Sequence, residues 1–350
     1  MGASPLVSVL LVTWNSAQYV ERCLASLARQ DYPTLELVVV DNASTDGTPE
    51  LLLSGSSQCR ILLNDANLGF AAAQNQAIRT AHGEWLLTLN PDVELAPDFI
   101  SRLMRAAERC PDVGVLCGKL PRMQPDGTRT RTLDSTGIYF TRNLRHLDRG
   151  SDEEDRGQYD QPEYVFGATA AAALYRRAMT DDVSVNGEFF DEWFFSYRED
   201  ADVAWRAQLM GWRCLYVPDA VGYHVRQVTP ETVRRASPAV QYHSVKNRFA
   251  QRIKNISPGL YVRLFVPIAL RDLLILGYAL LLDQTLLRAL AALWRNRKQL
   301  WRKRRAIQKR RRVTDRELLK WFSDEPVSFP AAPEQPAAVS VPAQVIQASR

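Results

Sequence analysis

The chain has 350 residues, of which 46% are hydrophobic and 24% are charged, and its formal net charge is +5. This hydrophobic content can build a sizeable core, which excludes a globally disordered protein. The five cysteines are odd in number and include no C-x-x-C pair. The sequence therefore indicates neither a disulfide scaffold nor a cysteine zinc site, and it fits a reducing compartment.

Up to about residue 250, short apolar runs alternate with amphipathic helical patterns, which is typical of an α/β protein. Residues 1–5 contain no Lys or Arg, and the segment is too short for a secretory signal. The apolar runs predict strands at 7–12, 35–42, 60–64, 85–90 and 113–120. The periodic segments between them predict helices after the first strand, from Thr48, over 71–81 and from Pro97.

Polar residues follow four successive predicted strands. They are the segments 13–15, 41–42, 64–67 and 90–92, which carry Thr, Asn and Asp. In an open α/β sheet, ligands bind at the carboxyl ends of the strands, so together these segments predict a site. Taken singly, each is also an ordinary turn. Neither a G-x-G-x-x-G after the first strand nor a P-loop motif is present, so dinucleotide and P-loop chemistry are unsupported.

The composition changes at about Leu260, where a Leu-rich helical region begins. Its longest uncharged run is 273–282, well short of the ~20 residues that a spanning helix needs. One helical face predicts a helix that lies in a membrane surface, with a buried hairpin or a dimer interface as the alternative. This face consists of Leu286, Leu287, Leu290, Leu293, Trp294 and Trp301, with Arg288, Arg295, Lys298 and Arg302 away from it.

The basic charge is concentrated in residues 295–312, which hold eleven Lys or Arg and no acid. The rest of the chain is therefore net acidic. Beside an amphipathic helix, such a segment could hold the protein on an anionic bilayer. From residue 326 to 350 the chain is mostly Pro, Ala, Ser, Val and Gln, which predicts a disordered tail.

A family resemblance spans roughly residues 6–250. VSVLLVTWNSAQYVERCLASLARQDYPTLELVVVDNASTDGT resembles the nucleotide-binding half of family 2 glycosyltransferases. The blocks NLGFAAAQNQAI, LLTLNPDVEL and FFDEWFFSYREDADVAWRAQLMGWRCLYVPDAVGYH are similar to its bacterial rhamnosyltransferase branch. The resemblance implies a GT-A fold, a Rossmann-like mixed sheet flanked by helices, over 1–255. An amphipathic helical region for membrane association (256–325) and the tail (326–350) would follow it.

For the donor, the resemblance implies that Asp41 hydrogen-bonds the uracil or thymine ring of a sugar nucleotide. A carboxylate that accepts from the ring N–H rejects bases lacking that donor. Gly69 would let the backbone approach the donor closely. The implied donor-binding residues are Thr13, Trp14, Asn15, Asp41, Asn42, Asn67, Gly69, Asn90 and Asp92.

Asn90-Pro91-Asp92 stands where the family carries its D-x-D metal motif. Because the first acidic position is Asn90, only Asp92 is expected to contact a divalent cation directly. His224 stands where related enzymes have a histidine near the metal and diphosphate. The resemblance thus implies Mg²⁺ or Mn²⁺ at Asp92 and His224, held through hard ligands and bridging the donor phosphates. The alternatives are a turn at Asp92 and a structural histidine.

The acidic cluster at 199–202 is the candidate for proton transfer. An inverting transfer needs one carboxylate to take the proton of the acceptor hydroxyl. By its position in the matching motif Asp200 is the predicted base, with Glu199 beside it. Asp202 with Arg206 would pin the helix. A solvated acidic helix start is the alternative. The acceptor or phosphate candidates are Gly167, Thr169, Arg206, Lys246 and Arg248.

These residues predict an inverting, metal-dependent glycosyltransferase that uses a dTDP- or UDP-linked sugar, with dTDP-rhamnose suggested by the resemblance. The expected acceptor is a lipid-linked or cell-surface polysaccharide, and the expected place is the cytoplasmic face of a bacterial membrane, bound peripherally. No nucleic acid partner is expected, and a homodimer is left open. A nucleotidyltransferase, which would need a Gly/Arg-rich loop after the first strand, is one alternative. A non-catalytic membrane or nucleic-acid binding protein using the basic helix is the other.

Overall fold

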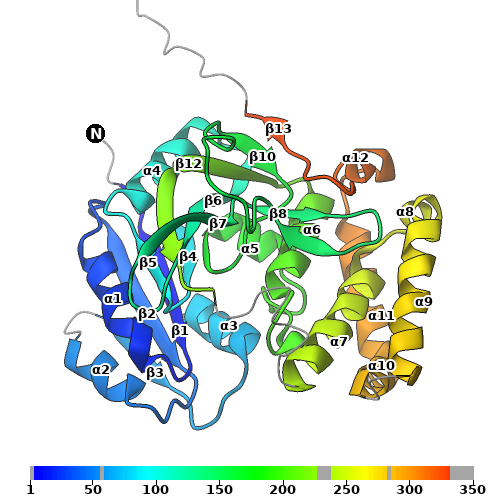
Figure 1. Ribbon diagram of the computed structural model, residues 1–350, viewed down its shortest axis with the longest axis horizontal. Coiled ribbons are helices and arrows are strands. Elements are labelled where there is room, and N and C mark those ends of the chain that lie inside the picture. The colour runs from blue at the N-terminus through cyan, green and yellow to red at the C-terminus, as the bar shows by residue number, and fades with distance from the viewer. Residues whose placement is uncertain (1–3, 56–58, 227–237, 282–284, 332–350) are drawn as a thin grey trace, which may run out of the picture.

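A mixed sheet forms the centre of the molecule, with helices on both faces (Figure 1). The computed structural model describes residues 4–55, 59–226, 238–281 and 285–331. The strands are β1 (Val7–Thr13), β2 (Leu35–Asp41), β3 (Arg60–Leu63), β4 (Trp85–Leu89), β5 (Val93–Leu95), β6 (Val113–Met123), β7 (Arg129–Ser135), β8 (Ile138–Phe140), β9 (His146–Asp148), β10 (Glu163–Val165), β11 (Ala172–Arg176), β12 (Arg213–His224) and β13 (Phe329–Pro330).

The helices alternate with the strands in the first half of the chain and follow one another in the last third. They are α1 (Ala17–Ala28), α2 (Thr48–Gly55), α3 (Phe70–Thr80), α4 (Phe99–Arg109), α5 (Arg177–Val183), the 3-10 helix η1 (Glu192–Phe194), α6 (Glu199–Met210), α7 (Pro238–Asn255), α8 (Pro258–Arg263), α9 (Phe265–Leu281), α10 (Thr285–Arg295), α11 (Arg297–Arg310) and α12 (Asp315–Leu319). The predicted α/β sheet with a C-terminal helical extension is confirmed.

The strand order is β13-β10-β12-β6-β11-β4-β1-β2-β3, with β5 paired to β12 and β7 to β6. β4, β1, β2 and β3 run parallel, whereas β11 is antiparallel to both β4 and β6. The carboxyl ends of the parallel strands meet at one edge, which is the usual place for a ligand in such a sheet.

The buried strand β1 shows why the parallel strands are continuous apolar runs. Val9 and Leu11 pack into the core that contains α1 and α4, whereas Leu10 and Val12 pack into the core that contains α3. Successive side chains of a strand point to opposite faces, so a strand covered on both sides is apolar at nearly every position.

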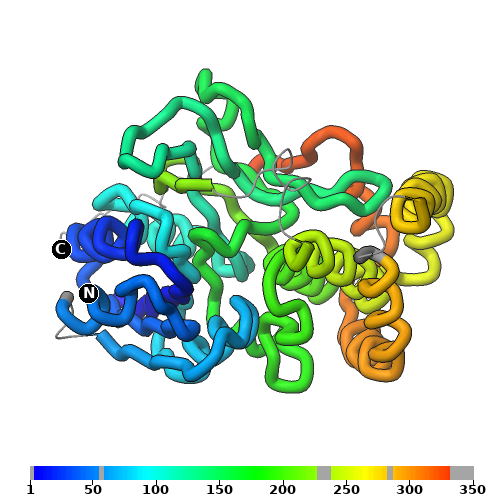
Figure 2. The backbone as a smooth tube through the Cα atoms, turned by 60° about the horizontal axis from the view of Figure 1, so that its bottom comes forward, coloured from blue at the N-terminus to red at the C-terminus, as the bar shows by residue number. Residues whose placement is uncertain are grey.

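The C-terminal helices pack against the body at the end of the molecule opposite α1 and α2 (Figures 1 and 2). α10 and α11 both contact α7. Lys303 of α11 is buried and donates 2.7 Å hydrogen bonds to Glu188 and Asp191, while Lys254 of α7 pairs with Asp191 and Asp202. These buried ion pairs tie the helices to the segment that leads into α6.

The predicted membrane-facing stripe of α10 and α11 is wrong in part. Leu293 is buried and Leu290 packs with it in the small core around Phe194 and Phe249, because this side of α10 covers α7. Leu287, Trp294 and Trp301 are exposed, and the side chain of Leu286 lies outside the described residues. The broad apolar surface of this region lies instead on α8 and α9.

The first residues of the predicted tail, 326–331, lie within the described part of the chain. The short strand β13 pairs antiparallel with β10, so Phe329 lies along the sheet edge. Residues 332–350 of the predicted disordered tail lie outside the described residues. None of the helices in the described ranges has the length and apolarity needed to cross a bilayer.

Candidate active site

The donor side of the candidate site lies where β1 and β2 end. Thr13 and Asp41 are register partners on these parallel strands, and Thr13 Oγ1 donates a 2.7 Å hydrogen bond to Asp41 Oδ1. The backbone N–H of Ser44 donates to Asp41 Oδ2 at 2.9 Å. Oδ1 also accepts a 2.6 Å hydrogen bond from Ser44 Oγ, so the buried carboxylate is fixed in orientation and Oδ2 keeps a second lone pair for a ligand.

Trp14 and Asn15 form the exposed turn that follows Thr13. Trp14 is 56% exposed, and Asn15 has a left-handed backbone with φ 50°. Asn15 Oδ1 accepts a 2.9 Å hydrogen bond from the N–H of Thr45, which joins this turn to the turn after Asp41. An exposed indole beside a fixed carboxylate offers an aromatic surface to a planar base.

Asn42, Asn67 and Gly69 form the adjoining loop. Asn42 Nδ2 donates to Asn67 Oδ1 at 3.1 Å, and the same oxygen accepts the N–H of Gly69 at 2.8 Å. Gly69 has φ +86°, and a Cβ there would lie 2.6 Å from the backbone oxygen of Phe195. Only glycine satisfies both requirements, so this position is fixed by the close approach of Phe195.

Asp92 and His224 are brought together by the pairing of β5 with β12, in which Val93 is opposite His224. His224 Nε2 lies 3.4 Å from Asp92 Oδ1, and Nδ1 lies 2.7 Å from Asp134 Oδ2. Burial disfavours a charged imidazole, but Asp92 and Asp134 outweigh it and raise the pKa of His224 to about 10. Asn90, the other motif residue, donates its backbone N–H to Ala171 O at 2.9 Å.

The Asp92–His224 pair fits a divalent cation that is bound together with a diphosphate. In the part of the chain that the structure describes, no cluster of three or more His, Cys, Asp or Glu could hold a metal alone. A Mg²⁺-like ion commonly takes one or two protein ligands and completes its shell with phosphate oxygens and water. Asp134 occupies Nδ1 and leaves Nε2 directed at Asp92, so a bound cation would displace the Nε2 proton and be held by Nε2 and Asp92.

Glu199 and Asp200 open α6 and differ in environment. Glu199 is buried, and burial followed by the charge of Asp200 raises the pKa of Glu199 well above its usual range. Asp200 is partly exposed and accepts the N–H of Ala201 at 2.7 Å and that of Ala170 at 3.4 Å. Burial followed by the charge of Asp148 raises the pKa of Asp200 to about 6. Of the two carboxyl groups, Glu199 is the more deeply buried, and its pKa is raised chiefly by that burial.

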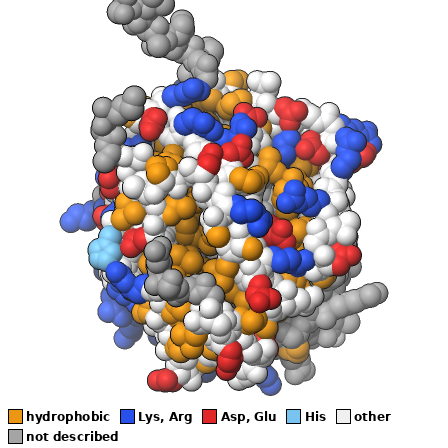
Figure 3. All heavy atoms as spheres, turned by 90° about the vertical axis from the view of Figure 1, so that its left-hand side faces the viewer, with side chains coloured by type: hydrophobic (Ala, Val, Ile, Leu, Met, Phe, Trp, Pro, Cys, Tyr) orange, Lys and Arg blue, Asp and Glu red, His pale blue; other side chains and the backbone are white. Residues whose placement is uncertain are grey.

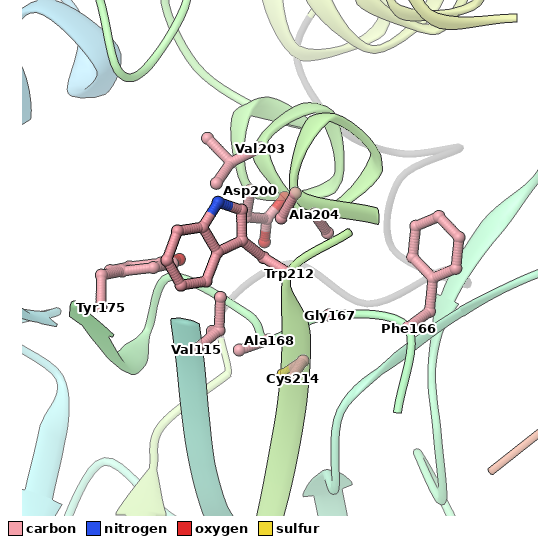
Figure 4. Close-up of a pocket in the computed structure, with 11 residues that line it drawn as sticks. Val115, Phe166, Gly167, Ala168, Tyr175, Asp200, Val203, Ala204, Trp212 and Cys214 are labelled. Carbon is pink, nitrogen blue, oxygen red and sulfur yellow. The ribbon is translucent and has the colours of Figure 1, made fainter. Parts of the chain in front are cut away.

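An apolar cavity beneath the start of α6 accounts for the desolvation of Asp200 (Figure 4). Besides Asp200, its wall consists of Val115, Phe166, Gly167, Ala168, Tyr175, Val203, Ala204, Ala207, Trp212 and Cys214. A carboxylate against such a wall loses hydration, which favours the protonated form.

The loop between η1 and α6 is strained. Phe195, Tyr197 and Arg198 have φ values of 67°, 71° and 70°, a region that non-glycine residues rarely adopt. The buried Asn247 of α7 holds this loop, because its Nδ2 donates to the backbone oxygens of Ser196 and Tyr197 at 2.8 Å each. Strain that is held by surrounding contacts is typical of functional segments.

Gly167 and Thr169 lie beside the acidic pair. A Cβ at Gly167 would lie 2.2 Å from Cβ of Ala204, so glycine is needed for α6 to pack this closely. Thr169 is partly exposed and directly precedes Ala170, the donor to Asp200. The structure therefore brings Thr169 next to the predicted base.

The basic candidates are buried within the protein. The Arg206 guanidinium donates to Asp202 at 3.0 Å, Val183 O at 2.6 Å and Phe189 O at 2.5 Å. Its donors are thus occupied, which contradicts the predicted acceptor or phosphate role for Arg206 and agrees with its pairing to Asp202.

Lys246 and Arg248 lie on α7. Lys246 Nζ donates to Trp193 O at 2.5 Å, and Arg248 Nη2 donates to Asn143 O at 2.7 Å. Burial lowers the pKa of each to about 8. Their contact with an acceptor stays a prediction.

Asp134 and Asp148 were not predicted as site residues. Arg226 bridges them, with Nη1 at 3.0 Å from Asp134 and 2.8 Å from Asp148. Both aspartates come from the segment between β6 and β11, whose short strands carry no strong periodic signal. Buried carboxylates can be identified as partners of His224 only when the tertiary pairing is known.

The family model described as "Glycosyl transferase family 2" matches residues 8–184. A curated relative, the N-acetylglucosaminyl-diphospho-decaprenol L-rhamnosyltransferase of Mycobacterium tuberculosis, is 31% identical over 242 residues, which cover 63% of this chain and 76% of the relative. The putative colanic acid biosynthesis glycosyl transferase WcaA of Escherichia coli is 36% identical over 104 residues, or 29% of this chain and 37% of that protein.

Two solved structures share the fold. TarS 1-349 of S. aureus in complex with UDP has a TM-score of 0.51 and 20% identity, and the match covers 87% of this chain and 90% of that one. GalNAc-T7 with UDP, GalNAc and Mn²⁺ has a TM-score of 0.56 and 13% identity, and the match covers 71% of this chain and 48% of that one.

Proposed function

The chain belongs to glycosyltransferase family 2, and we propose that it transfers rhamnose from dTDP-rhamnose. The acceptor is a lipid-linked or cell-surface glycan, and the transfer inverts the configuration at the anomeric carbon. Family membership makes the chain a glycosyltransferase, in place of the nucleotidyltransferase and non-catalytic alternatives. The M. tuberculosis relative is named as an L-rhamnosyltransferase acting on a lipid-linked sugar, which supports this donor and this acceptor class.

One observation carries the proposal: a series of contacts joins the cation pair to Asp148, whose charge acts on the predicted base. His224 contacts Asp92 and Asp134, Arg226 bridges Asp134 and Asp148, and the charge of Asp148 acts on Asp200. The leaving group and the acceptor hydroxyl must lie on opposite sides of one anomeric carbon, so groups for each must be close together.

On the donor side, Asp41 would accept the imide N–H of uracil or thymine while Trp14 covers the ring. Thr13 keeps the Asp41 carboxylate oriented. A divalent cation, Mg²⁺ or Mn²⁺, would be held by Asp92 and His224, and when bound it would neutralise the charge of the diphosphate leaving group. The Mn²⁺ in the GalNAc-T7 structure, bound with UDP, supports this assignment.

On the acceptor side, Asp200 would remove the proton from the attacking hydroxyl. The acceptor oxygen forms a bond to the anomeric carbon, the bond from that carbon to the diphosphate oxygen breaks, and the electron pair leaves with the nucleoside diphosphate. Glu199, whose pKa is raised by burial and by the charge of Asp200, would in its protonated form donate a hydrogen bond and orient the acceptor.

The test is turnover of dTDP-rhamnose and UDP-sugars by the purified protein with Mg²⁺ or Mn²⁺, with and without a lipid-linked acceptor. We expect release of dTDP with wild type and a loss of about 10²- to 10⁴-fold with Asp200→Asn. Asp181→Asn, on the exposed side of α5, is the matched control and should keep full activity. No hydrolysis or transfer with any of these donors would refute the proposal.

A lipid-linked acceptor would also determine where the protein works. We infer peripheral association with the cytoplasmic side of a bacterial membrane, where such an acceptor meets a nucleotide sugar. Activity that rises when the acceptor is presented in vesicles would support this placement.

A further inference from the structure

The helices α8 and α9 expose a continuous apolar surface. Its members, here called the apolar face, are Val262, Val266, Leu270, Leu273, Leu274 and Leu281, which are between 60% and 83% exposed. Within α9 they recur at spacings of three, four and seven residues, so they lie on one side of the helix. A surface of this extent on a soluble protein marks an interaction site.

A second group of exposed side chains lies on α10 and α11, and α10 contacts α9. Trp294, Lys298, Trp301 and Arg305 are all exposed and follow one another at spacings of three or four residues. No carboxylate in the described ranges pairs with Lys298, Arg302 or Arg305. We call Lys298, Arg302, Arg305 and Lys309, with the two tryptophans, the basic stripe.

The basic segment 295–312 is divided between two roles. Lys303, Arg304 and Arg310 point inward, where they bond Asp191, Ile253 O and Ser184 O. Those side chains attach α11 to the body, as do Arg311 on Asp315 and Arg312 on Asp182, and the basic stripe belongs to the part that remains for a partner. The opposite end of the molecule has acidic and basic side chains interspersed (Figure 3).

We propose that the apolar face and the basic stripe dock the protein on an anionic lipid bilayer, with α9 lying in the plane of the interface. This inference rests on the proposed function, because it is the proposed lipid-linked acceptor that requires the protein to meet a bilayer through this surface. Three observations favour a bilayer: exposed leucines, tryptophans at the border between apolar and charged surface, and unpaired cations. A second copy of this chain would bring two basic stripes together, which charge repulsion opposes.

The proposed bilayer surface is connected to the active site through helix–helix contacts. α10 contacts both α9 and α7. Asn247 of α7 holds the loop that precedes Glu199. A bilayer beneath α9 would therefore lie two helices away from the strained segment of the acceptor side.

The experiment measures sedimentation of the full chain with vesicles of phosphatidylcholine, with or without phosphatidylglycerol. We expect binding that requires phosphatidylglycerol and weakens with salt. The double variant Leu270→Gln/Leu274→Gln should lower the partition coefficient about tenfold, whereas Leu53→Gln on the exposed side of α2 should not. Arg302→Gln/Arg305→Gln should lower it by about fivefold per charge. Arg105→Gln, exposed on α4, is its matched control.

Three results would overturn the inference. One is equal vesicle binding by wild type and the Leu270/Leu274 variant, and another is no vesicle binding by wild type. The third is a dimer in sedimentation velocity that only this variant dissociates, which would assign the face to a second copy. Hydrolysis of dTDP-rhamnose in solution separates the two proposals, because the surface variants should retain it. Vesicle binding without hydrolysis would count against the proposed function alone.

Discussion

Glu199 and Asp200 are neighbours in sequence, yet burial and nearby charge separate their proton affinities. The pKa of Glu199 lies well above its usual range, whereas the pKa of Asp200 is about 6. Asp200 is the more exposed of the two and accepts two backbone N–H groups, which stabilise its ionised form. This difference in environment favours Asp200 over Glu199 as the group that accepts a proton in the proposed reaction.

Transfer should therefore depend on pH through Asp200. Only the ionised carboxylate can accept the hydroxyl proton, so we expect kcat/KM to fall as the pH drops through about 6. The measurement is the pH–rate profile of sugar transfer, with protein fluorescence at each pH as a check on folding.

The second cause of the raised pKa can be tested separately. Asp148→Asn removes the nearby negative charge, and we expect the acidic limb of the profile to move to lower pH. A limb that does not move would show that Asp148 does not act on the titrating group.

Asp134 is the partner that orients His224. Asp134→Asn removes its negative charge and weakens the 2.7 Å contact with Nδ1, so we expect the affinity for Mn²⁺ in the presence of dTDP to drop by about 10- to 100-fold. Isothermal titration of Mn²⁺ measures this directly, without turnover.

The matched experiment repeats this substitution in a His224→Ala background. There Asp134→Asn should have little further effect on Mn²⁺ affinity, since the ring that it orients is gone. An equal loss in both backgrounds would assign Asp134 a general structural role.

At the scale of elements, α11 is fastened by a buried cation. Lys303→Met removes the cation that pairs with Glu188 and one of the two cations that pair with Asp191, and we expect the free energy of unfolding to fall by about 3 kcal/mol. Urea unfolding measures this, and Lys309→Met, on the exposed side of the same helix, should change it by less than about 0.5 kcal/mol. Equal effects would show that the buried pairs are not what holds α11.

The parallel strands could be predicted because they are buried on both faces. β1, β2, β4 and β6 begin within one residue of their predicted positions, since an uninterrupted apolar run is the condition for such a strand. The three-residue strands β8, β9 and β10 were not predicted, because their pairing is set by partners distant in sequence.

The C-terminal helices show where periodicity is insufficient. The pattern of α10 is amphipathic, but it does not say whether the apolar side meets lipid or protein. Leu293 is buried in the core with Phe249, whereas Leu274 of the less amphipathic α9 is 73% exposed. The location of an apolar surface depends on what packs against each helix, which the sequence alone does not specify.

At the scale of the whole molecule, the site is assembled from segments more than 200 residues apart. Asp41 and Asp92 were predictable because they follow strands whose carboxyl ends share one edge. Arg206 was assigned by position in a motif, and its burial among Asp202 and backbone oxygens shows that motif position does not determine what a side chain contacts.

The contact between Gly69 and Phe195 has a consequence for how the binding of donor and of acceptor would be coupled. The N–H of Ala71 donates to Phe195 O at 3.1 Å, and a Cβ at Gly69 would collide with the same residue. The loop at Gly69 and the loop at Phe195 therefore share one surface, and under the proposed function a displacement at the donor side would be transmitted to the acceptor side. Thermodynamic linkage is reciprocal, so whatever factor the nucleotide sugar contributes to acceptor affinity, the acceptor must return to the nucleotide sugar.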